Sequence, residues 1–398
     1  MLRAAAIPGG DRLSYDGSLF GPVVRVRRGT VLAVTLQNDL GAATSLQWHG
    51  LRGAAAAAAI IEGTATVPPG GSTTTTIRAS EPGLSWFHPA ARAGQAGQAA
   101  AGLRGILIVE EDDPPVVDLD LLLVIEDGAG QGFRINGVPA PGRGILPPGG
   151  RVRLRLLNAT TSRLVPVGID GAPCQVIAID GQPSSLFPPL RGTVPLGPGA
   201  RFELMVDAPA TAGTTVAVVA RALPGSADAS APVISLYELA TSGEPRAHLP
   251  PLVPLPPNPA LPPAIPLERS IRAKLTVEAA AGVAPGQPRW RLNGVANNDL
   301  PAKPLFAVKA GSAVTLSFEN RSSVPLPVRV HGQAMRLLHA KDDGWEPYWR
   351  DSVILPPGAV TLVAFVADAP GPWSIDSTDA EQAATGLRTW FAVTGGAT

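Results

Sequence analysis

One pattern recurs three times along the 398 residues. Each copy runs from a turn glycine to an asparagine through an alternating, mostly β-branched segment, at Gly29–Asn38, Gly149–Asn158 and Gly311–Asn320. Apolar residues that alternate with polar ones between turn formers are typical of a half-buried strand. The repeat therefore predicts three copies of one β unit.

A second signature follows each copy. It reads Val-Pro-Pro-Gly-Gly at Val67–Gly71, Val-Pro-Leu-Gly-Pro-Gly at Val194–Gly199 and Ile-Leu-Pro-Pro-Gly at Ile354–Gly358, and another alternating segment comes after each. The chain also has 44 Gly and 43 Pro, which disfavour long helices because Pro lacks a backbone donor and Gly costs backbone entropy. We expect an all-β protein of three consecutive sandwiches.

The domain boundaries follow from composition. A charged stretch that ends in proline, Glu110–Pro115, closes the first unit, and the segment from Pro245 to Pro266 contains ten prolines, these two included. A segment so rich in proline is expected to be an extended, semi-rigid connector. The predicted division is residues 1–113, residues 114–244, a connector at 245–268, and residues 269–398.

Charge and cysteine content exclude several classes of protein. The 32 basic and 32 acidic residues balance, whereas a general polyanion binder needs a basic surplus, so we expect no nucleic-acid partner. The single cysteine, Cys174, rules out an intrachain disulfide, a multi-cysteine zinc site and an iron–sulfur cluster. No apolar run predicts a membrane span, and the first residues lack the apolar core of a signal peptide.

Four segments carry a resemblance to a known family. They are Thr44–Gly50, Trp86–Ala90, Leu326–Gly332 and Asp376–Gln382, framed by Gly102–Gly105 and Trp349–Val353. In this order they resemble the copper-ligand blocks of the multicopper oxidase family, which read His-Trp-His-Gly, His-x-His, His-Pro-x-His-x-His-Gly and His-Cys-His-x-x-x-His. The resemblance covers essentially the whole chain and implies three cupredoxin-like Greek-key β-sandwich domains.

The ligands themselves are mostly replaced. Only His49, His88 and His331 match histidines of the family's pattern. At the blue-copper site, Ser377 stands where the resemblance places the thiolate, and Leu326 and Gln382 stand where it places imidazoles. The other vacated ligand positions, in the oxygen-reducing cluster, hold Gln47, Ala90, Arg329, Asp376 and Thr378. Because the thiolate is the soft ligand of a blue-copper site, its loss predicts a protein that is not an oxidase.

The family also has a copper-free branch, the FtsP (SufI) branch of exported bacterial cell-division proteins, which this chain resembles in its lost ligands. The resemblance implies a non-catalytic, monomeric scaffold without a cofactor that acts through protein partners in the periplasm. Two alternatives stay open. The three histidines would serve a copper-dependent oxidoreductase or a metal-binding protein without turnover, or else they are hydrogen-bonded core residues.

Two predictions concern the charged residues of these blocks. Asp376, Asp379 and Glu381 are read either as paired carboxylates of a hydrolase or as a solvated acidic turn, and the turn is favoured. Arg329 and Asp376 both occupy cluster positions, so we expect an ion pair that fills the copper volume, with Gln47, Thr378 and the three histidines completing its hydrogen bonds. The alternative turns Arg329 outward to solvent.

Overall fold

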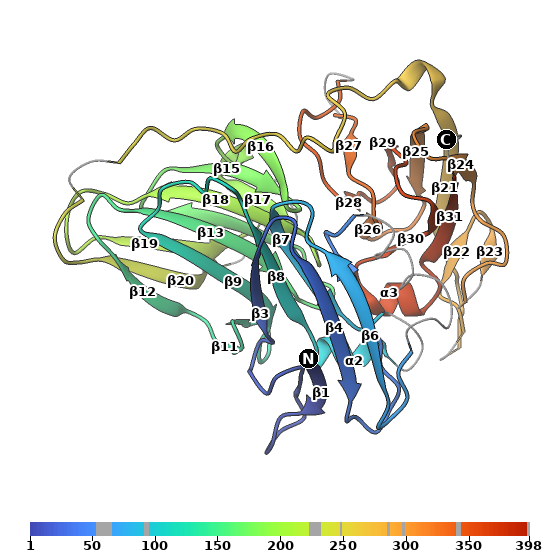
Figure 1. Cartoon of the computed structure of the whole chain (residues 1–398), viewed down its shortest axis with the longest axis horizontal. Coiled ribbons are helices and arrows are strands. Elements are labelled where there is room, and N and C mark those ends of the chain that lie inside the picture. The colour runs from blue at the N-terminus through green and yellow to red at the C-terminus, as the bar shows by residue number, and fades with distance from the viewer. Residues whose placement is uncertain are drawn as a thin grey trace. The chain divides into compact units, whose positions relative to one another are not determined.

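The structure is a computed structural model that describes residues 1–52, 66–90, 95–222, 232–246, 249–284, 287–296, 299–339 and 344–395. Strands dominate this part of the chain (Figure 1). Its helical segments are short: α2 (Ala96–Ala100), α3 (Ala380–Ala384) and the 3-10 turns η1 (Leu190–Gly192) and η2 (Leu267–Arg269). The predicted all-β class is confirmed. No helix in the described ranges is long and apolar enough to cross a membrane.

Backbone contacts group the chain into two compact units. The first combines Met1–Glu110 with Asn258–Thr398, and the second is Glu111–Pro257. The first unit holds two β-sandwiches. One sheet of its N-terminal sandwich has the order β2 (Leu13–Ser14), β1 (Leu2–Ala6), β4 (Val31–Asn38), β6 (Ser72–Arg78). The other has the order β3 (Val23–Arg27), β8 (Gly105–Glu110), β7 (Gly83–His88), β5 (Gln47–His49).

The C-terminal sandwich of the same unit has a six-stranded and a five-stranded sheet. The first has the order β23 (Val295–Ala296), β22 (Trp290–Leu292), β21 (Ile271–Ala279), β25 (Ala313–Asn320), β29 (Val360–Val366), β27 (Met335–Leu337). The second has the order β24 (Ala307–Lys309), β31 (Arg388–Thr394), β30 (Gly371–Ser377), β26 (Leu326–Val330), β28 (Ser352–Leu355). Buried apolar residues of both sandwiches form one continuous cluster, which fixes their strands relative to each other.

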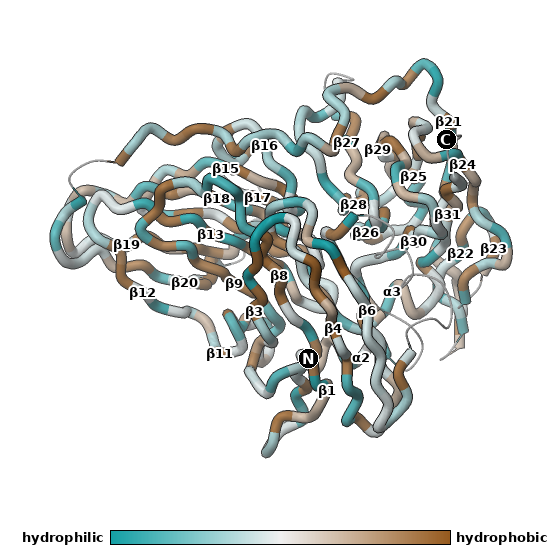
Figure 2. Tube along the Cα trace, in the orientation of Figure 1, coloured by the Kyte–Doolittle hydropathy of each residue, from teal (hydrophilic) through white to brown (hydrophobic). Residues whose placement is uncertain are grey.

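The second unit is a third sandwich. Its seven-stranded sheet has the order β11 (Val138–Pro139), β10 (Phe133–Ile135), β9 (Leu119–Asp127), β13 (Arg151–Asn158), β18 (Arg201–Asp207), β15 (Cys174–Ile179), β16 (Gln182–Phe187). The five-stranded sheet has the order β12 (Gly142–Leu146), β20 (Ile234–Thr241), β19 (Thr215–Ala220), β14 (Val165–Asp170), β17 (Thr193–Leu196). Apolar and polar residues interleave along the strands of both units, as the alternating pattern requires (Figure 2).

The threefold repeat is also a structural repeat. Asn38, Asn158 and Asn320 end the strands β4, β13 and β25, each of which pairs with one parallel and one antiparallel neighbour. Each asparagine amide donates to the carbonyl just before the proline- and glycine-rich turn of the second signature, at 2.8 Å, 2.7 Å and 3.0 Å in chain order. The two signatures found in the sequence are therefore joined by the same hydrogen bond in all three sandwiches.

One strand departs from the half-buried pattern. In β13 all eight residues are buried, including Arg151, Arg153 and Arg155 on the face that alternation predicts to be exposed. Arg153 Nε lies 2.7 Å from Glu203 Oε2, and Arg155 Nη1 lies 3.0 Å from the same oxygen. Because a carboxylate accompanies the guanidinium groups, their burial is electrostatically tolerated, and the expectation of an exposed face is wrong here.

The proline-rich segment packs against the second unit over its first part. Leu255 is buried against Ile177 and Met205, and Arg151 Nη1 donates to the Pro250 carbonyl at 2.9 Å. Residues 249–266 contain neither strand nor helix and lead into η2. Apolar packing and a partly buried hydrogen bond hold this part of the connector in place.

Candidate functional site

The three histidines predicted as a residual metal site lie together in the first unit. His49 ends β5, His88 ends the neighbouring strand β7, and His331 follows β26 of the C-terminal sandwich. The ring centroids of His49 and His88 are 4.4 Å apart and nearly parallel, and those of His49 and His331 are 5.2 Å apart. All three side chains are buried. We call them the histidine cluster; His331 lies more than two hundred residues after the other two in the sequence.

Each histidine has a hydrogen-bond partner that indicates whether one of its ring nitrogens carries a proton. Arg329 Nη1 donates to His49 Nδ1, so that nitrogen presents its lone pair to the guanidinium. His88 Nδ1 lies 2.6 Å from the Pro89 carbonyl oxygen and therefore carries a proton. His331 Nε2 lies 2.8 Å from Asp376 Oδ1, to which it donates. The rings are held by protein groups on their in-plane edges.

Arg329 does enter the cluster, but its carboxylate partner differs from the predicted one. Arg329 and Asp376 are register partners on β26 and β30, so their side chains leave the sheet side by side. The ion pair of Arg329 is instead with Asp351, Nε to Oδ1 at 3.5 Å, and Asp376 pairs with His331. The predicted Arg329–Asp376 pair is wrong. The carboxylate of Asp351, one residue before β28, pairs with the guanidinium of Arg329, and the carboxylate of Asp376 pairs with His331. The outward orientation is also wrong, since Arg329 is 2 % exposed.

Asp376 is ionised in this setting. Burial raises its pKa, but the charge and hydrogen bond of His331, with two nearby arginines, lower it by more, so the net pKa lies below the ordinary value. Ser374 Oγ donates to its second oxygen at 3.1 Å. Gln47 Nε2 lies 3.5 Å from His331 Nε2, but both nitrogens are donors when His331 donates to Asp376, so this contact is not a hydrogen bond. Among the described residues Thr378 Oγ1 has no hydrogen-bond partner, so neither side chain completes the network as predicted.

The positions that the resemblance assigns to blue copper are linked to one another. Ser377 Oγ lies 2.9 Å from Gln382 Oε1 and 3.0 Å from the Pro327 carbonyl oxygen, and it accepts from the Asp379 backbone N–H at 3.1 Å. Leu326 is fully buried and belongs to the apolar core. Ser377 and Gln382 are thus engaged in hydrogen bonds, and Leu326 is engaged in core packing. Ala90 is also buried, and its backbone N–H donates to Ser45 Oγ.

The acidic segment after Ser377 is a helix cap. Asp379 is 5 % exposed and is the N-cap of α3, where its Oδ1 accepts from the backbone N–H groups of Glu381 and Gln382. Glu381 is exposed and pairs with Arg289 at 2.8 Å. The three carboxylates face different partners, so they form neither a hydrolase pair nor the solvated turn that sequence analysis favours.

Sequence analysis missed two residues of this region. Asp351 is present only as part of the framing segment Trp349–Val353, and its role depends on the pairing of β28 with β26. Gln333 is 2 % exposed, and both of its side-chain polar atoms are without a hydrogen-bond partner. The only sequence signal for Gln333 is its position two residues after the matched histidine His331.

The described ranges contain no group of three or more His, Cys, Asp or Glu side chains placed to hold one metal ion. The near-parallel stacking of His49 on His88 explains part of this, because the lone pairs of stacked rings lie in separate planes. Arg329 contacts Nδ1 of His49, and Asp376 contacts Nε2 of His331.

His88 makes the stability of the fold depend on pH. Burial lowers the pKa of His88 to about 3, and the positive charge of Arg329 adds to this while the Pro89 carbonyl opposes it. Because the unfolded histidine titrates near pH 6.5, the unfolded state binds the extra proton between pH 6.5 and 3. We expect the free energy of unfolding to fall with acidification in this window, by up to about 1.4 kcal/mol per pH unit from this group.

Urea denaturation at a series of pH values measures this effect. A His88→Gln variant is the matched comparison, because it keeps a polar side chain and loses the titration. Its free energy of unfolding should fall less steeply than that of the parent between pH 6.5 and 4. Parallel pH profiles of the two proteins would contradict the prediction.

Comparison with known proteins gives a consistent family. The chain matches the family described as "Multicopper oxidase" at residues 7–114 and again at residues 270–396. "Multicopper oxidase MmcO" of Mycobacterium tuberculosis is 23% identical over 437 residues, which cover 91% of this chain and 79% of that protein. The crystal structure of a multi-copper oxidase from Pseudomonas thermotolerans superimposes with a TM-score of 0.83 at 25% identity, over 99% of this chain and 98% of that one.

A second group of relatives carries another name. "Cell division protein FtsP" of Edwardsiella tarda is 29% identical over 218 residues. That alignment covers 48% of this chain and 45% of the relative, so the likeness spans about half of each protein. Both named groups agree with the resemblance seen in the four sequence segments.

Proposed function

The chain belongs to the multicopper oxidase family, and we propose that it is a copper-free, non-catalytic member that acts as a protein-interaction scaffold in the cell envelope. The observation that carries the proposal is the placement of Arg329 inside the histidine cluster, with its guanidinium donating to His49 Nδ1. A buried guanidinium is always charged, and it stands at a position where the family's pattern has an imidazole.

The donor set supports this reading. Copper prefers imidazole and thiolate ligands that are deprotonated at the metal-facing atom. Here the lone pair of His49 Nδ1 is taken by Arg329, and His331 Nε2 carries a proton toward Asp376. His88 keeps one nitrogen available but faces the field of Arg329. This donor set therefore supports the copper-free reading of the three histidines.

The blue-copper position gives a separate prediction. Ser377→Cys restores a thiol, but Leu326 and Gln382 provide no imidazoles, so the trigonal ligand set of blue copper stays incomplete. We expect this variant to show no intense blue absorption and no oxidase turnover after copper is added. Absorption spectroscopy of the copper-treated variant beside the copper-treated parent is the measurement, and an intense blue band in the variant alone would overturn the prediction.

The role in the envelope rests on relatives. The FtsP proteins bear the name of cell division proteins, and this chain matches them over about half of its length. By analogy we propose a division- or stress-related function through protein partners in the periplasm, with the chain acting as a monomer. Fractionation of producing cells tests the location: recovery with envelope proteins supports it, and recovery only with cytoplasmic proteins contradicts it.

Oxygen consumption tests the absence of catalysis. The full chain is incubated with Cu²⁺, desalted, and supplied with a phenolic electron donor under air. A non-catalytic scaffold consumes no oxygen above the rate of the same mixture without protein. Turnover that depends on His331, shown by its loss in His331→Gln, would instead establish the copper-dependent oxidoreductase, and tight metal without turnover would establish the metal-binding alternative.

A further inference from the structure

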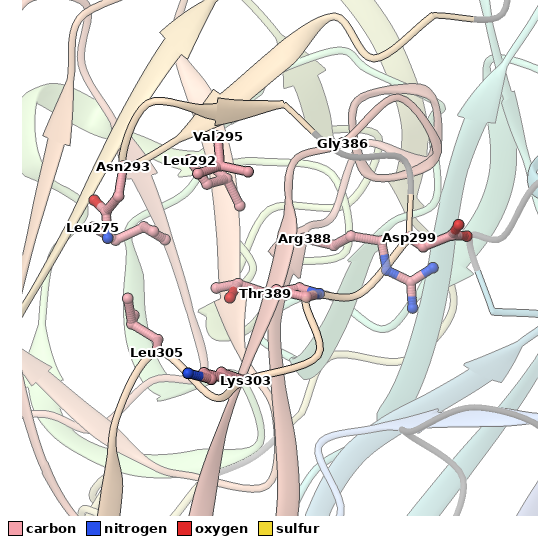
Figure 3. A pocket seen from close by; sticks show the side chains of 11 residues that line it. Leu275, Leu292, Asn293, Val295, Asp299, Lys303, Leu305, Gly386, Arg388 and Thr389 are labelled. Atoms are coloured by element: carbon pink, nitrogen blue, oxygen red, sulfur yellow. The ribbon is translucent and has the colours of Figure 1, made fainter.

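The C-terminal sandwich contains a pocket whose lining includes none of the three histidines. Its volume is about 190 Å³, and it is bounded by β21, the β22–β23 hairpin, the segment before β24 and β31 (Figure 3). Leu275, Leu292 and Leu305 provide its apolar walls, and all three belong to or pack against the core of the first unit. A cavity of roughly 150 Å³ with such walls accommodates a benzene ring, so this pocket is large enough for a ring-sized apolar group.

Hydrogen bonds hold two walls of the pocket in place. Asn293 Oδ1 accepts from the Thr276 backbone N–H at 2.8 Å, which fixes the turn between β22 and β23 against β21. On the other side, Trp390 Nε1 donates to the Pro301 carbonyl at 2.7 Å, and the Leu305 N–H donates to the Trp390 carbonyl at 2.7 Å. The pocket is therefore formed by the folded chain itself, as small-molecule sites usually are.

The charged side chains of the described lining lie at its edges. Arg388 and Thr389 are consecutive on β31, so their side chains leave the strand on opposite faces. Arg388 is in register with Asp376, and Figure 3 shows its guanidinium beside Asp299, away from the leucines. Lys303 is exposed, so water solvates its ammonium group. A charged ligand among the leucines would lose its hydration without a buried partner of opposite charge, which favours an uncharged ligand.

Thr389 provides a polar group on the buried side of the pocket. It is 4 % exposed, and its register partner Ile375 is 1 % exposed, so both side chains lie on the core face of the sheet. Figure 3 shows Thr389 between Leu292 and Lys303. A hydroxyl can donate a hydrogen bond, and an ammonium group can only donate. The complement to these two groups is an acceptor oxygen, and a carbonyl oxygen provides one without a charge.

We propose that this pocket binds an uncharged, ring-sized apolar molecule that carries one carbonyl oxygen. The ring lies against Leu275, Leu292 and Leu305, and the oxygen accepts from the Thr389 hydroxyl. Burial of the ring supplies most of the affinity, and the hydrogen bond sets its orientation. The inference goes beyond the proposed scaffold role and rests on different residues, so either one can fail alone.

Acetophenone is the probe, and benzoate is its charged counterpart of similar shape. The full chain, labelled at leucine and valine methyl groups, is titrated with each to about 10 mM, and methyl NMR shifts give affinity and location. We expect acetophenone to bind at least tenfold more tightly than benzoate, with the largest shifts at Leu275, Leu292 and Leu305. Equal affinities, shifts centred elsewhere, or no saturable shift with acetophenone would each overturn the proposal.

A variant of Thr389 tests the hydrogen bond. Thr389→Val keeps the volume of the side chain and removes its hydroxyl, so it should weaken acetophenone about fivefold and leave toluene, which has no oxygen, unchanged. Thr361→Val is the matched control, since Thr361 lies on β29 of the same sandwich and outside the pocket lining. If the two variants weaken acetophenone equally, the assigned contact is wrong.

A second variant tests the location without removing a polar group. Leu292→Phe places a larger side chain in the pocket and should abolish the binding of both acetophenone and toluene. The methyl signals of Val314 and Leu316 on β25 report whether the sandwich stays intact in this variant and in Thr389→Val. Binding retained by an intact Leu292→Phe protein would place the ligand elsewhere and overturn the proposal.

Discussion

Replacing Arg329 with methionine is expected to lower the free energy of unfolding by about 3–5 kcal/mol. Methionine fills much of the arginine volume, so the loss comes from charge. Arg329 is 2 % exposed and Asp351 lies 3.5 Å from its Nε, with a side chain that is 13% exposed. Removing the guanidinium leaves the carboxylate of Asp351 in a place where water solvates it poorly, and it removes the donor to His49.

A double-mutant cycle isolates the pair. Asp351→Asn added to Arg329→Met should recover part of the loss, because the residual charge disappears with it. Arg289→Met is the control: its exposed pair with Glu381 contributes little, so urea denaturation should show little change. A loss in Arg329→Met no larger than in Arg289→Met would show that the guanidinium is not buried in this network.

Replacing Glu203 with glutamine is expected to destabilise the second unit by about 3 kcal/mol. Its Oε2 serves both Arg153 and Arg155, and the side chain is 1 % exposed. Burial lowers the pKa of Arg153, but the carboxylates of Glu203 and Glu111 raise it by more, so the net pKa of Arg153 lies above its ordinary value. The loss is at the low end because Glu111 and Asp120 still face the two arginines.

Hydrogen exchange measures this by segment. All seven tryptophans lie outside residues 111–257, so fluorescence reports the first unit, whereas exchange of β13 and β18 amides reports the second. Glu203→Gln should speed exchange in these strands, and Glu238→Gln, which removes an exposed pair with Arg143, should not. Unchanged protection of β13 in Glu203→Gln would contradict the account.

The framework of the fold could be predicted because its signals are local. A glycine with positive φ opens each repeat, at 85°, 71° and 84° for Gly29, Gly149 and Gly311, and an asparagine closes it. The effect of each glycine and asparagine on the backbone depends only on its own strand and turn. The histidine cluster could also be anticipated, since the resemblance places its blocks in order along three similar sandwiches.

The partners of the charged residues could not be predicted in the same way. Arg329 has Asp376 opposite on one neighbouring strand and Ser352 opposite on the other, and Asp351, next to Ser352, takes the ion pair. Which carboxylate pairs with Arg329 depends on how far each side chain extends across the sheet. The residues next to Arg329 in the sequence do not determine this. The burial of the β13 arginines could not be predicted for a similar reason, because their partners Glu203 and Glu111 lie far away in the sequence.

We propose that a buried arginine occupies the place of a copper ligand and keeps the histidine cluster free of copper. Elemental analysis tests it most directly. The full chain is incubated with excess Cu²⁺ at neutral pH, desalted, and its copper content is measured per chain. The account predicts a content well below one copper per chain, the same for the parent and for His49→Gln. One or more copper ions retained by the parent and lost in His49→Gln would contradict it.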